Sequence, residues 1–316
     1  MLFRRRLVTS PIVFVHIPKT AGTSFRIGAE KSFRRSQVLK DYGRGARATS
    51  SLLEKHVYSE TDHWALRQSI VNGGVRFLTG HFHASKYAPL FDAACFVSFV
   101  RHPVQRLVSE YHHAQKYHDY QGDFQSFYRA PENTNRQARI LRGIPLGAFG
   151  FLGITERYNE SLHLINEIYS TKIGVLEKNR SESSLELSQS TLDELIKRNQ
   201  RDVKLFEVAS DMLTWRSKLA KESLSFVHGE YSVSSPELLR GFACISASDA
   251  LVRVRVRVNG REIDVVTANE YRDELGLLGL PRGGHVAFSL KLPPGVDVNQ
   301  VSCEVLDTSQ PLARVF

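Results

Sequence analysis

Four residues with phosphate-binding chemistry, Lys19, Gly22, Thr23 and Ser24, follow the apolar run Ile12–Ile17. A strand that ends in a tight turn and opens a helix directs backbone N–H groups at an anion. The lysine adds a mobile positive charge, the glycine permits close backbone approach, and the hydroxyls add donors. The sequence therefore predicts a phosphate cradle, although not a standard nucleotide-triphosphatase loop, because GxxxxGK[ST] is absent and the lysine precedes the glycine. The alternative is an ordinary helix start capped by Thr or Ser.

A second pair of anion-binding residues follows another apolar run, Cys95–Val100. Arg101 stands at the end of this run, and Ser109 lies eight residues later in an expected helix. A guanidinium offers a planar fork of donors and a serine offers one hydroxyl, so both could bind one phosphate. The alternative is a surface arginine paired with a carboxylate and a serine that faces solvent.

A histidine follows a third run, Val75–Thr79, in the segment Gly80–His83. Histidine titrates near neutral pH and suits the role of general base, so His81 is the candidate base. His83 is the second choice, because in an extended segment it would share a face with His81. The alternative is a structural or surface histidine. No carboxylate with convincing spacing accompanies this pair, and we predict no metal site.

The three runs are apolar on both faces and alternate with expected helices, which is typical of a parallel sheet in a three-layer α/β domain. The three segments that carry the candidate residues begin at the carboxyl ends of these strands, where open α/β sheets bind ligands. The rest of this region is predicted to contain helix and loop over 31–60, a helix after Arg101 and a short helix at Gln137–Leu141. A strand-to-helix turn is expected at Ile154, with a helix over 156–168. An exposed loop at 179–190 and a helical region at Leu192–Leu224 follow.

The composition changes after Pro236. Leu251–Val258 alternates apolar and charged residues, which predicts a half-buried antiparallel strand with its arginines on the solvent face. Asn259-Gly260 then predicts a hairpin turn. Further strands are expected at Ile263–Val266, Val286–Leu292 and Val301–Leu306. We predict a first domain over 1–238 and a small β-sandwich-like domain over 239–316. The alternative is an extension packed on the first domain.

Composition and charge exclude several protein classes. The 316 residues are 42% hydrophobic and 24% charged, unlike collagen, low-complexity or disordered chains. No stretch approaches the roughly 18–20 apolar residues that span a bilayer. The net charge is +9, and the excess lies in the first 240 residues, which favours anionic partners such as nucleotides, sulfated or phosphorylated groups and nucleic acid. Basic character for solubility alone is the plain alternative.

The three cysteines show neither the framework of a disulfide scaffold nor a CxxC zinc motif. Cys95 is expected in the core, and a bridge between Cys244 and Cys303 is neither required nor excluded. Arg4–Arg6 precede a short apolar piece that Pro11 interrupts and that lacks a small-residue cleavage site. We interpret this piece as a strand rather than a signal sequence and expect a cytoplasmic protein.

Two motifs together resemble a known family. His16–Ser24 and Phe99–Tyr111 are similar to the 5′-phosphosulfate loop and the 3′-phosphate segment of sulfotransferases that use 3′-phosphoadenosine 5′-phosphosulfate (PAPS). The branch resembled includes heparan sulfate 2-O-sulfotransferases and related bacterial enzymes. Asn135–Leu141 and Gly153–Tyr158 resemble the same branch more weakly, so the resemblance covers roughly residues 12–170. The C-terminal segment is similar to a small β-domain appended to bacterial sulfotransferases and glycosyltransferases.

The resemblance implies a function and roles. The protein would transfer a sulfuryl group from PAPS to a hydroxyl of a carbohydrate or glycoconjugate, with no metal, nucleic acid or integral membrane contact. Arg101 and Ser109 would hold the 3′-phosphate, and His81 would be the base. The position two residues before His81, a histidine in the family, is Thr79. Lys19 would stabilise the leaving phosphate. The 5′-phosphosulfate would be held by Lys19, Thr20, Ala21, Gly22, Thr23 and Ser24.

Two rival functions remain at this stage. A nucleotide kinase on the same fold is disfavoured by the pair Arg101 and Ser109 and by the missing GK[ST]. A non-catalytic polyanion-binding protein fits the basic charge but has no need of His81. Some roles also stay open. Glu156 is either a substrate contact or a structural ion pair. A basic group forms either a groove for an acidic acceptor or a solvated helix: Arg34, Arg35, Lys40, Arg44 and Arg47. The remaining histidines are read as structural, with His102 shaping a turn, His112 and His113 on a polar helix face, and His16 in the core or near the donor.

Overall fold

A parallel β-sheet organises the first part of the chain in the computed structural model, which describes residues 10–176, 185–235 and 237–315. Its strands are β1 (Ile12–Val15), β2 (Val38–Asp41), β3 (Phe77–Gly80), β4 (Phe96–Val100) and β5 (Phe151–Ile154). They form one five-stranded sheet in the order β2-β3-β1-β4-β5, with every neighbouring pair parallel. The predicted α/β class with a central parallel sheet is confirmed.

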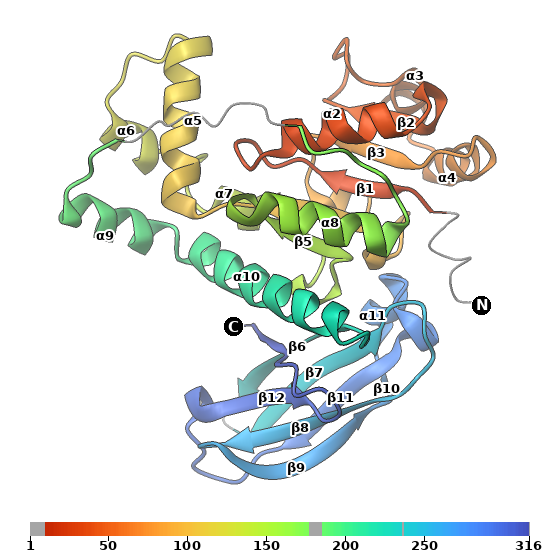
Figure 1. Ribbon diagram of the computed structural model, residues 1–316, viewed down its shortest axis with the longest axis vertical. Coiled ribbons are helices and arrows are strands. Elements are labelled where there is room, and N and C mark those ends of the chain that lie inside the picture. The colour runs from red at the N-terminus through yellow and green to blue at the C-terminus, as the bar shows by residue number, and fades with distance from the viewer. Residues whose placement is uncertain (1–9, 177–184, 236, 316) are drawn as a thin grey trace.

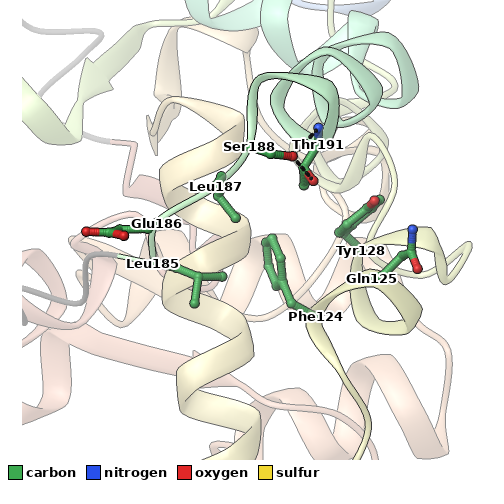
Figure 2. Close-up of a pocket in the computed structure, with 8 residues that line it drawn as sticks. All are labelled: Phe124, Gln125, Tyr128, Leu185, Glu186, Leu187, Ser188 and Thr191. Atoms are coloured by element: carbon green, nitrogen blue, oxygen red, sulfur yellow. Dashed lines mark hydrogen bonds between the residues drawn. The ribbon is translucent and has the colours of Figure 1, made fainter.

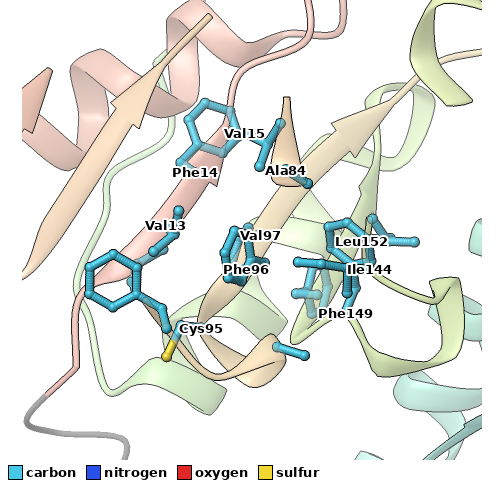
Figure 3. Close-up of a cluster of buried hydrophobic side chains, with 14 of the residues drawn as sticks. Val13, Phe14, Val15, Ala84, Cys95, Phe96, Val97, Ile144, Phe149 and Leu152 are labelled. Carbon is cyan, nitrogen blue, oxygen red and sulfur yellow. The ribbon is translucent and has the colours of Figure 1, made fainter. Parts of the chain in front are cut away.

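The central strands are buried on both faces, as their unbroken apolar runs predict. Every residue of β1, β3, β4 and β5 is buried. Figure 3 shows side chains of β1 and β4 packed in the core with Leu152 of β5 and with Ile144 and Phe149 from the segment before it. Burial of this kind contributes about 25 cal/mol per Å² of apolar surface and fixes the strands that carry the candidate residues.

Helices and short turns cover the sheet (Figure 1). The helices are α2 (Gly22–Ser32), α3 (Ser51–Leu53), α4 (His63–Asn72), α5 (Pro103–Tyr117), α6 (Phe124–Arg129), α7 (Arg136–Leu141), α8 (Tyr158–Tyr169), α9 (Gln189–Arg198) and α10 (Gln200–Lys221). The 3₁₀ helices are η1 (Arg35–Gln37), η3 (Ala84–Lys86), η4 (Ala93–Cys95), η5 (Leu146–Ala148) and η6 (Thr155–Arg157), and η2 (Glu54–Ser59) is a π-helix. The helical region predicted at Leu192–Leu224 consists of two helices that meet at Asn199. The prediction of helix and loop over 31–60 is wrong at Val38–Asp41, which is a strand.

The C-terminal part consists of two packed sheets, as predicted. Its elements are β6 (Val227–Ser235), β7 (Leu238–Ile245), β8 (Val252–Val258), β9 (Arg261–Ala268), β10 (Glu270–Tyr271), α11 (Asp273–Leu277), η7 (Pro281–Gly284), β11 (His285–Lys291), η8 (Val298–Gln300), β12 (Val301–Val305) and β13 (Ala313–Arg314). The sheet orders are β10-β11-β7-β6-β13 and β12-β8-β9, with a shared apolar core. The pairs are antiparallel except for β13 with β6, which is parallel. Asn259 and Gly260 have φ of 52° and 74° in the hairpin turn that joins β8 and β9.

The arginines of β8 lie on the solvent side, where acidic neighbours pair with them. Arg253 contacts Asp307, and Arg255 contacts both Glu262 and Glu304. Because β9, β12 and the turn after β12 supply their acidic partners, these two arginines form ion pairs rather than an open cationic surface.

The parallel sheet and the C-terminal sheets contribute residues to one apolar core. Phe242 of β7 and Val286 and Ala287 of β11 belong to the same apolar cluster as the parallel sheet. The backbone N–H of Gly147 in η5 donates to Glu230 of β6 at 3.0 Å. In Figure 1, α10 runs along the boundary between the two parts. The antiparallel sheets begin at Val227, whereas the sequence places a domain boundary between residues 238 and 239, and that boundary stays a prediction.

Two other features concern the whole chain. Cys95, Cys244 and Cys303 are buried free thiols, and burial raises the pKa of Cys95 and of Cys244 to about 12. Within the described ranges, no helix combines the length and apolarity needed to cross a membrane. Arg4–Arg6 lie outside the described residues.

Candidate active site

The three candidate segments meet because their strands are neighbours. β1 lies between β3 and β4, so the residues after these strands emerge at one edge of the sheet. Nδ1 of His81, after β3, lies 2.9 Å from the carbonyl oxygen of His16, after β1. Nη1 of Arg101, after β4, donates to the carbonyl oxygen of Lys19 at 3.4 Å. The fold therefore brings Lys19, His81 and Arg101 into one site.

The loop after β1 has a strained backbone. Lys19 and Ala21 have φ of 67° and 60°, in the left-handed region that costs a non-glycine residue about 1 kcal/mol or more. The hydroxyl of Thr20, fully buried, donates to the carbonyl oxygen of Ile17 at 2.9 Å. Thr20 therefore shapes the loop with its side chain, and strain of this kind is commonly retained at binding sites.

Helix α2 starts in this loop without a compensating charge. Ala21 occupies its N-cap position with no side-chain cap, and its first turn contains no acidic residue. The leading N–H groups of a helix have no acceptor within the helix and carry the positive end of its dipole. Thr23 is exposed here and Ser24 is buried. The N-terminus of α2 thus suits an anionic group.

Gly22 is required for packing at the start of α2. A Cβ atom at this position would overlap Cδ2 and Nε2 of the His16 ring. His16 is 5% exposed and has little room to move. Gly22 therefore lets the helix start approach the imidazole beside the candidate base.

Arg101 is fixed through its backbone. The side chain of Gln137 accepts from Arg101 N–H at 2.9 Å and donates to Arg101 C=O at 2.8 Å. The hydroxyl of Thr155 donates to Val100 C=O at 3.0 Å, and Glu156 accepts from His102 N–H at 3.0 Å. Glu156 therefore has a structural contact at the start of α5.

The cations of the site are partly desolvated. Burial lowers the pKa of Lys19 and also that of Arg101. The Nε atom of Arg101 is buried with no hydrogen-bond partner among the described residues. A buried cationic donor without an acceptor costs free energy that an anionic ligand would recover. The residues present thus fit a phosphate- or sulfate-bearing ligand.

Ser109 is buried in the middle of α5. Its side chain makes no hydrogen bond to Arg101 within the described residues, so their joint binding of one phosphate stays a prediction. The acidic residue next to it, Glu110, pairs with Arg106 of its own helix and with Arg136 of α7. Glu110 also acts on the loop after β1, because its charge raises the pKa of Lys19 against the effect of burial.

His81 has the protonation state that a general base needs. A carbonyl oxygen only accepts, so the contact with His16 assigns the proton of a neutral ring to Nδ1. The Nε2 lone pair then remains for an incoming proton. Desolvation lowers the pKa of His81; the bond to His16 opposes this shift, and Arg136 and Arg26 add to it. The imidazole is therefore neutral at neutral pH.

A second imidazole lies beside His81, but it comes from a different strand than the family pattern implies. The His16 and His81 rings are 4.5 Å apart between centroids. Burial, with His81 and Arg26, lowers the pKa of His16 to about 3, so His16 is neutral. Thr79 is fully buried in β3. His83 is exposed at the start of η3, and its role as second choice stays a prediction.

The basic residues before and after β2, and His113 of α5, differ in part from the predictions. The basic residues from Arg34 to Arg47 do not form a helix: they lie on η1, β2 and the loop that follows. Lys40 pairs with Glu30 at 3.0 Å, and Arg44 donates to the Tyr58 carbonyl. His113 differs from a plain polar-face residue, because the charge of Lys19 helps to lower its pKa.

Sequence reasoning missed Glu110, Arg136 and Gln137 as members of this site. Their signal was weak: the segment Asn135–Leu141 resembles the family, but nothing in it indicates which residues it contacts. A surface groove lies elsewhere, between α6 and the start of α9 (Figure 2), and none of its lining residues belongs to the site described above.

Comparison with known proteins supports one family. Residues 8–142 match the model of a family described as the sulfotransferase family. Among solved structures, the chain is similar to a sulfotransferase from Alicyclobacillus acidocaldarius, with 14% identity and a TM-score of 0.36. That similarity covers 63% of this chain and 95% of the other. A search of curated proteins found no match.

Proposed function

We propose that this protein is a PAPS-dependent O-sulfotransferase that acts on a hydroxyl of a carbohydrate or glycoconjugate. The family match over residues 8–142 supports a sulfotransfer reaction. The observation that carries the proposal is the contact between His81 Nδ1 and the His16 carbonyl at 2.9 Å. It leaves a neutral imidazole with a free Nε2 beside a loop and two cations that suit a phosphosulfate.

The donor would be held from two sides. Lys19, Gly22, Thr23 and Ser24, with the backbone of Thr20 and Ala21, would bind its 5′-phosphosulfate. Arg101, fixed by Gln137, would bind the 3′-phosphate together with Ser109. This second contact would distinguish PAPS from ATP, which has no 3′-phosphate.

The donor supplies a sulfuryl group bonded to a phosphate oxygen that leaves with the bonding electron pair. His81 Nε2 takes the proton of the acceptor hydroxyl as its oxygen bonds to sulfur. Lys19 stabilises the negative charge that develops on the leaving phosphate. The products are a sulfate ester, adenosine 3′,5′-bisphosphate (PAP) and a proton that His81 later releases to water.

The acceptor class rests on the family resemblance alone. A transfer assay tests it: the protein is incubated with PAPS labelled in the sulfuryl group and a panel of mono- and polysaccharides. We expect label in at least one carbohydrate. Transfer to none of them, with transfer to a phenol or another alcohol, would contradict the acceptor class and leave the reaction type standing.

The base is tested by two matched substitutions of exposed histidines in the same segment. His81→Ala should lower kcat about 10²- to 10⁴-fold, the range for a lost general base. His83→Ala should leave kcat within about threefold of the wild type. Full activity of His81→Ala would contradict the assignment.

A further inference from the structure

The imidazole of His16 contacts both halves of the site. Its ring centroid lies 4.5 Å from that of His81, and the two ring planes are tilted by 34°. The same ring packs against α2, because a Cβ atom on Gly22, the first residue of that helix, would overlap Cδ2 and Nε2 of His16. One side chain therefore contacts the candidate base and the helix start that suits the donor.

The backbone around His81 is fixed by both strands that neighbour β3. The N–H of His16 donates to the carbonyl oxygen of Gly80 at 3.1 Å, which continues the pairing of β1 with β3. On the β2 side, the N–H of His81 donates to the carbonyl oxygen of Asp41 at 3.1 Å. With the backbone held in this way, the His81 ring moves only about its side-chain bonds, and the groups packed against it decide where Nε2 points.

The His16 ring is itself held in place and acts through its shape. It is 5% exposed and stacks on Phe14 at 5.5 Å between centroids. Its Nδ1 atom is buried with no hydrogen-bond partner among the described residues, so packing rather than hydrogen bonding defines the contact with His81. The close approach of Gly22 leaves little room for a larger ring, and a five-membered ring fits this space.

We propose that His16 is a positioning residue for the transfer reaction. Its ring, packed against α2 and His81, keeps the His81 ring in the orientation that bonds Nδ1 to the His16 carbonyl and leaves Nε2 for the acceptor. This inference rests on the proposed function.

The orientation matters because a general base acts only within hydrogen-bond reach of the proton that it takes. Half a turn of the His81 ring about its outer side-chain bond exchanges Nδ1 with Cδ2 and Nε2 with Cε1. That turn breaks the bond to the His16 carbonyl and places a carbon atom where the acceptor proton must go. Tyr42 also contacts the His81 ring, at 5.2 Å between centroids, but it is only half-buried, so the buried His16 ring is the firmer restraint.

The first experiment needs no substrate. Long-range ¹H–¹⁵N correlation spectra of the labelled protein, recorded at about pH 8, where the ring is neutral, show which nitrogen of His81 carries the proton. The His81 signals are assigned by comparison with His81→Ala. We expect a proton on Nδ1 and none on Nε2 in the wild type. In His16→Ala the ring can leave the carbonyl, and both tautomers should be present.

The second experiment measures transfer from labelled PAPS to an acceptor found in the carbohydrate panel. His16→Ala should lower kcat about ten- to hundredfold, because a misplaced reacting group loses rate on this scale. The acceptor KM and the PAP affinity should stay within about threefold of the wild type, because the ring acts on the base and not on binding. His16→Asn keeps the part of the side chain nearest to Cβ and should lose less.

His228→Ala is the matched control. His228 of β6 is also 5% exposed, but it belongs to the C-terminal sheets. Its removal should lower the free energy of unfolding, as the removal of His16 should, and leave kcat unchanged. The comparison separates the positioning of the base from a general loss of stability.

Gly22→Ala perturbs the same ring from the side of α2. Because the new Cβ displaces the His16 ring, kcat at saturating donor should fall. Both substitutions act through one ring, so the double variant His16→Ala with Gly22→Ala should lose less kcat than the product of the two single losses.

The outcomes separate this inference from the proposed function. An unchanged His81 tautomer in His16→Ala, a loss of kcat no larger than that of His228→Ala, or losses that multiply in the double variant would each overturn the role of His16 and leave the sulfotransferase standing. If His16→Ala does not fold, the same comparisons are made with His16→Asn. A folded wild type that binds no PAP and transfers to no acceptor would overturn the proposed function and the role of His16 with it.

Discussion

The contact between Gln137 and the Arg101 backbone predicts a coupled loss of stability and of donor binding. Gln137 is fully buried and satisfies both Arg101 N–H and Arg101 C=O. Gln137→Met keeps a side chain of similar length and removes both hydrogen bonds. Each backbone group left without a partner costs about 1–3 kcal/mol. Because these groups are only partly buried, water can reach them, and we expect the low end, about 2 kcal/mol in total.

Gln137→Ala should cost more, because it also leaves a cavity. Adding about 1–2 kcal/mol for the lost packing gives about 3–4 kcal/mol. Arg101 would also lose its fixed direction, so both variants should bind PAP about tenfold or more weakly, equivalent to about 1.4 kcal/mol. Gln105→Met, at an exposed glutamine of α5, is the matched control and should behave as the wild type.

The assays are urea unfolding followed by circular dichroism and calorimetric titration with PAP. We expect the free energy of unfolding to be highest for the wild type, lower for Gln137→Met and lowest for Gln137→Ala. Wild-type stability and wild-type PAP affinity in Gln137→Met would refute the reasoning, because neither hydrogen bond would then matter for positioning Arg101.

Three further predictions follow from other residues. Gly22→Ala should weaken PAP binding and lower the free energy of unfolding by about 1–3 kcal/mol, because the new Cβ overlaps His16. Gly174→Ala is the control, because the space around its Cβ is open, and it should change neither quantity in the same titration and urea experiments. The acid limb of the pH profile of kcat/KM should reach half its maximum below pH 6.5, the ordinary value for histidine, because the pKa of His81 is lowered and the neutral base persists to lower pH; a half-maximum above pH 6.5 would contradict this. Burial raises the pKa of Glu230 from 4.5 to about 6, so its contribution to stability is complete below about pH 4.5 and is lost as pH rises through 6. The free energy of unfolding, measured in urea, should therefore be about 2 kcal/mol higher for Glu230→Gln than for the wild type at pH 7 and nearly the same at pH 4.5. An equal difference at both pH values would contradict the raised pKa of Glu230.

The parts of the fold that local sequence determines were predictable. Ile12–Val15 and Phe96–Val100 are buried on both faces, and their unbroken apolar runs indicated this. Val38–Asp41 gave no such signal, since Lys40 pairs with Glu30 and Asp41 is buried among hydroxyl and ammonium donors. These polar residues lie in a strand because of partners far along the chain, and local propensity carries no information about them.

In the candidate site too, local sequence does not reveal contacts between residues that are far apart in the chain. His81 and Arg101 directly follow a strand and Lys19 lies four residues after one, so sequence alone could select them. Arg136 and Gln137 act through Glu110 and Arg101, partners 26 and 36 residues away. Such contacts depend on how α5, α7 and β4 pack together. The His16 ring was likewise assigned to the core or the donor, and its contact with His81 follows only from β1 lying beside β3.

The most direct test of the central claim is calorimetric titration with PAP, with ATP and AMP as controls. We expect PAP to bind more tightly than either control, because it carries both a 5′-phosphate for the loop after β1 and a 3′-phosphate for Arg101. Arg101→Ala should abolish that preference. No binding of PAP by the well-folded protein, or equal binding of PAP and AMP, would contradict a PAPS-dependent sulfotransferase.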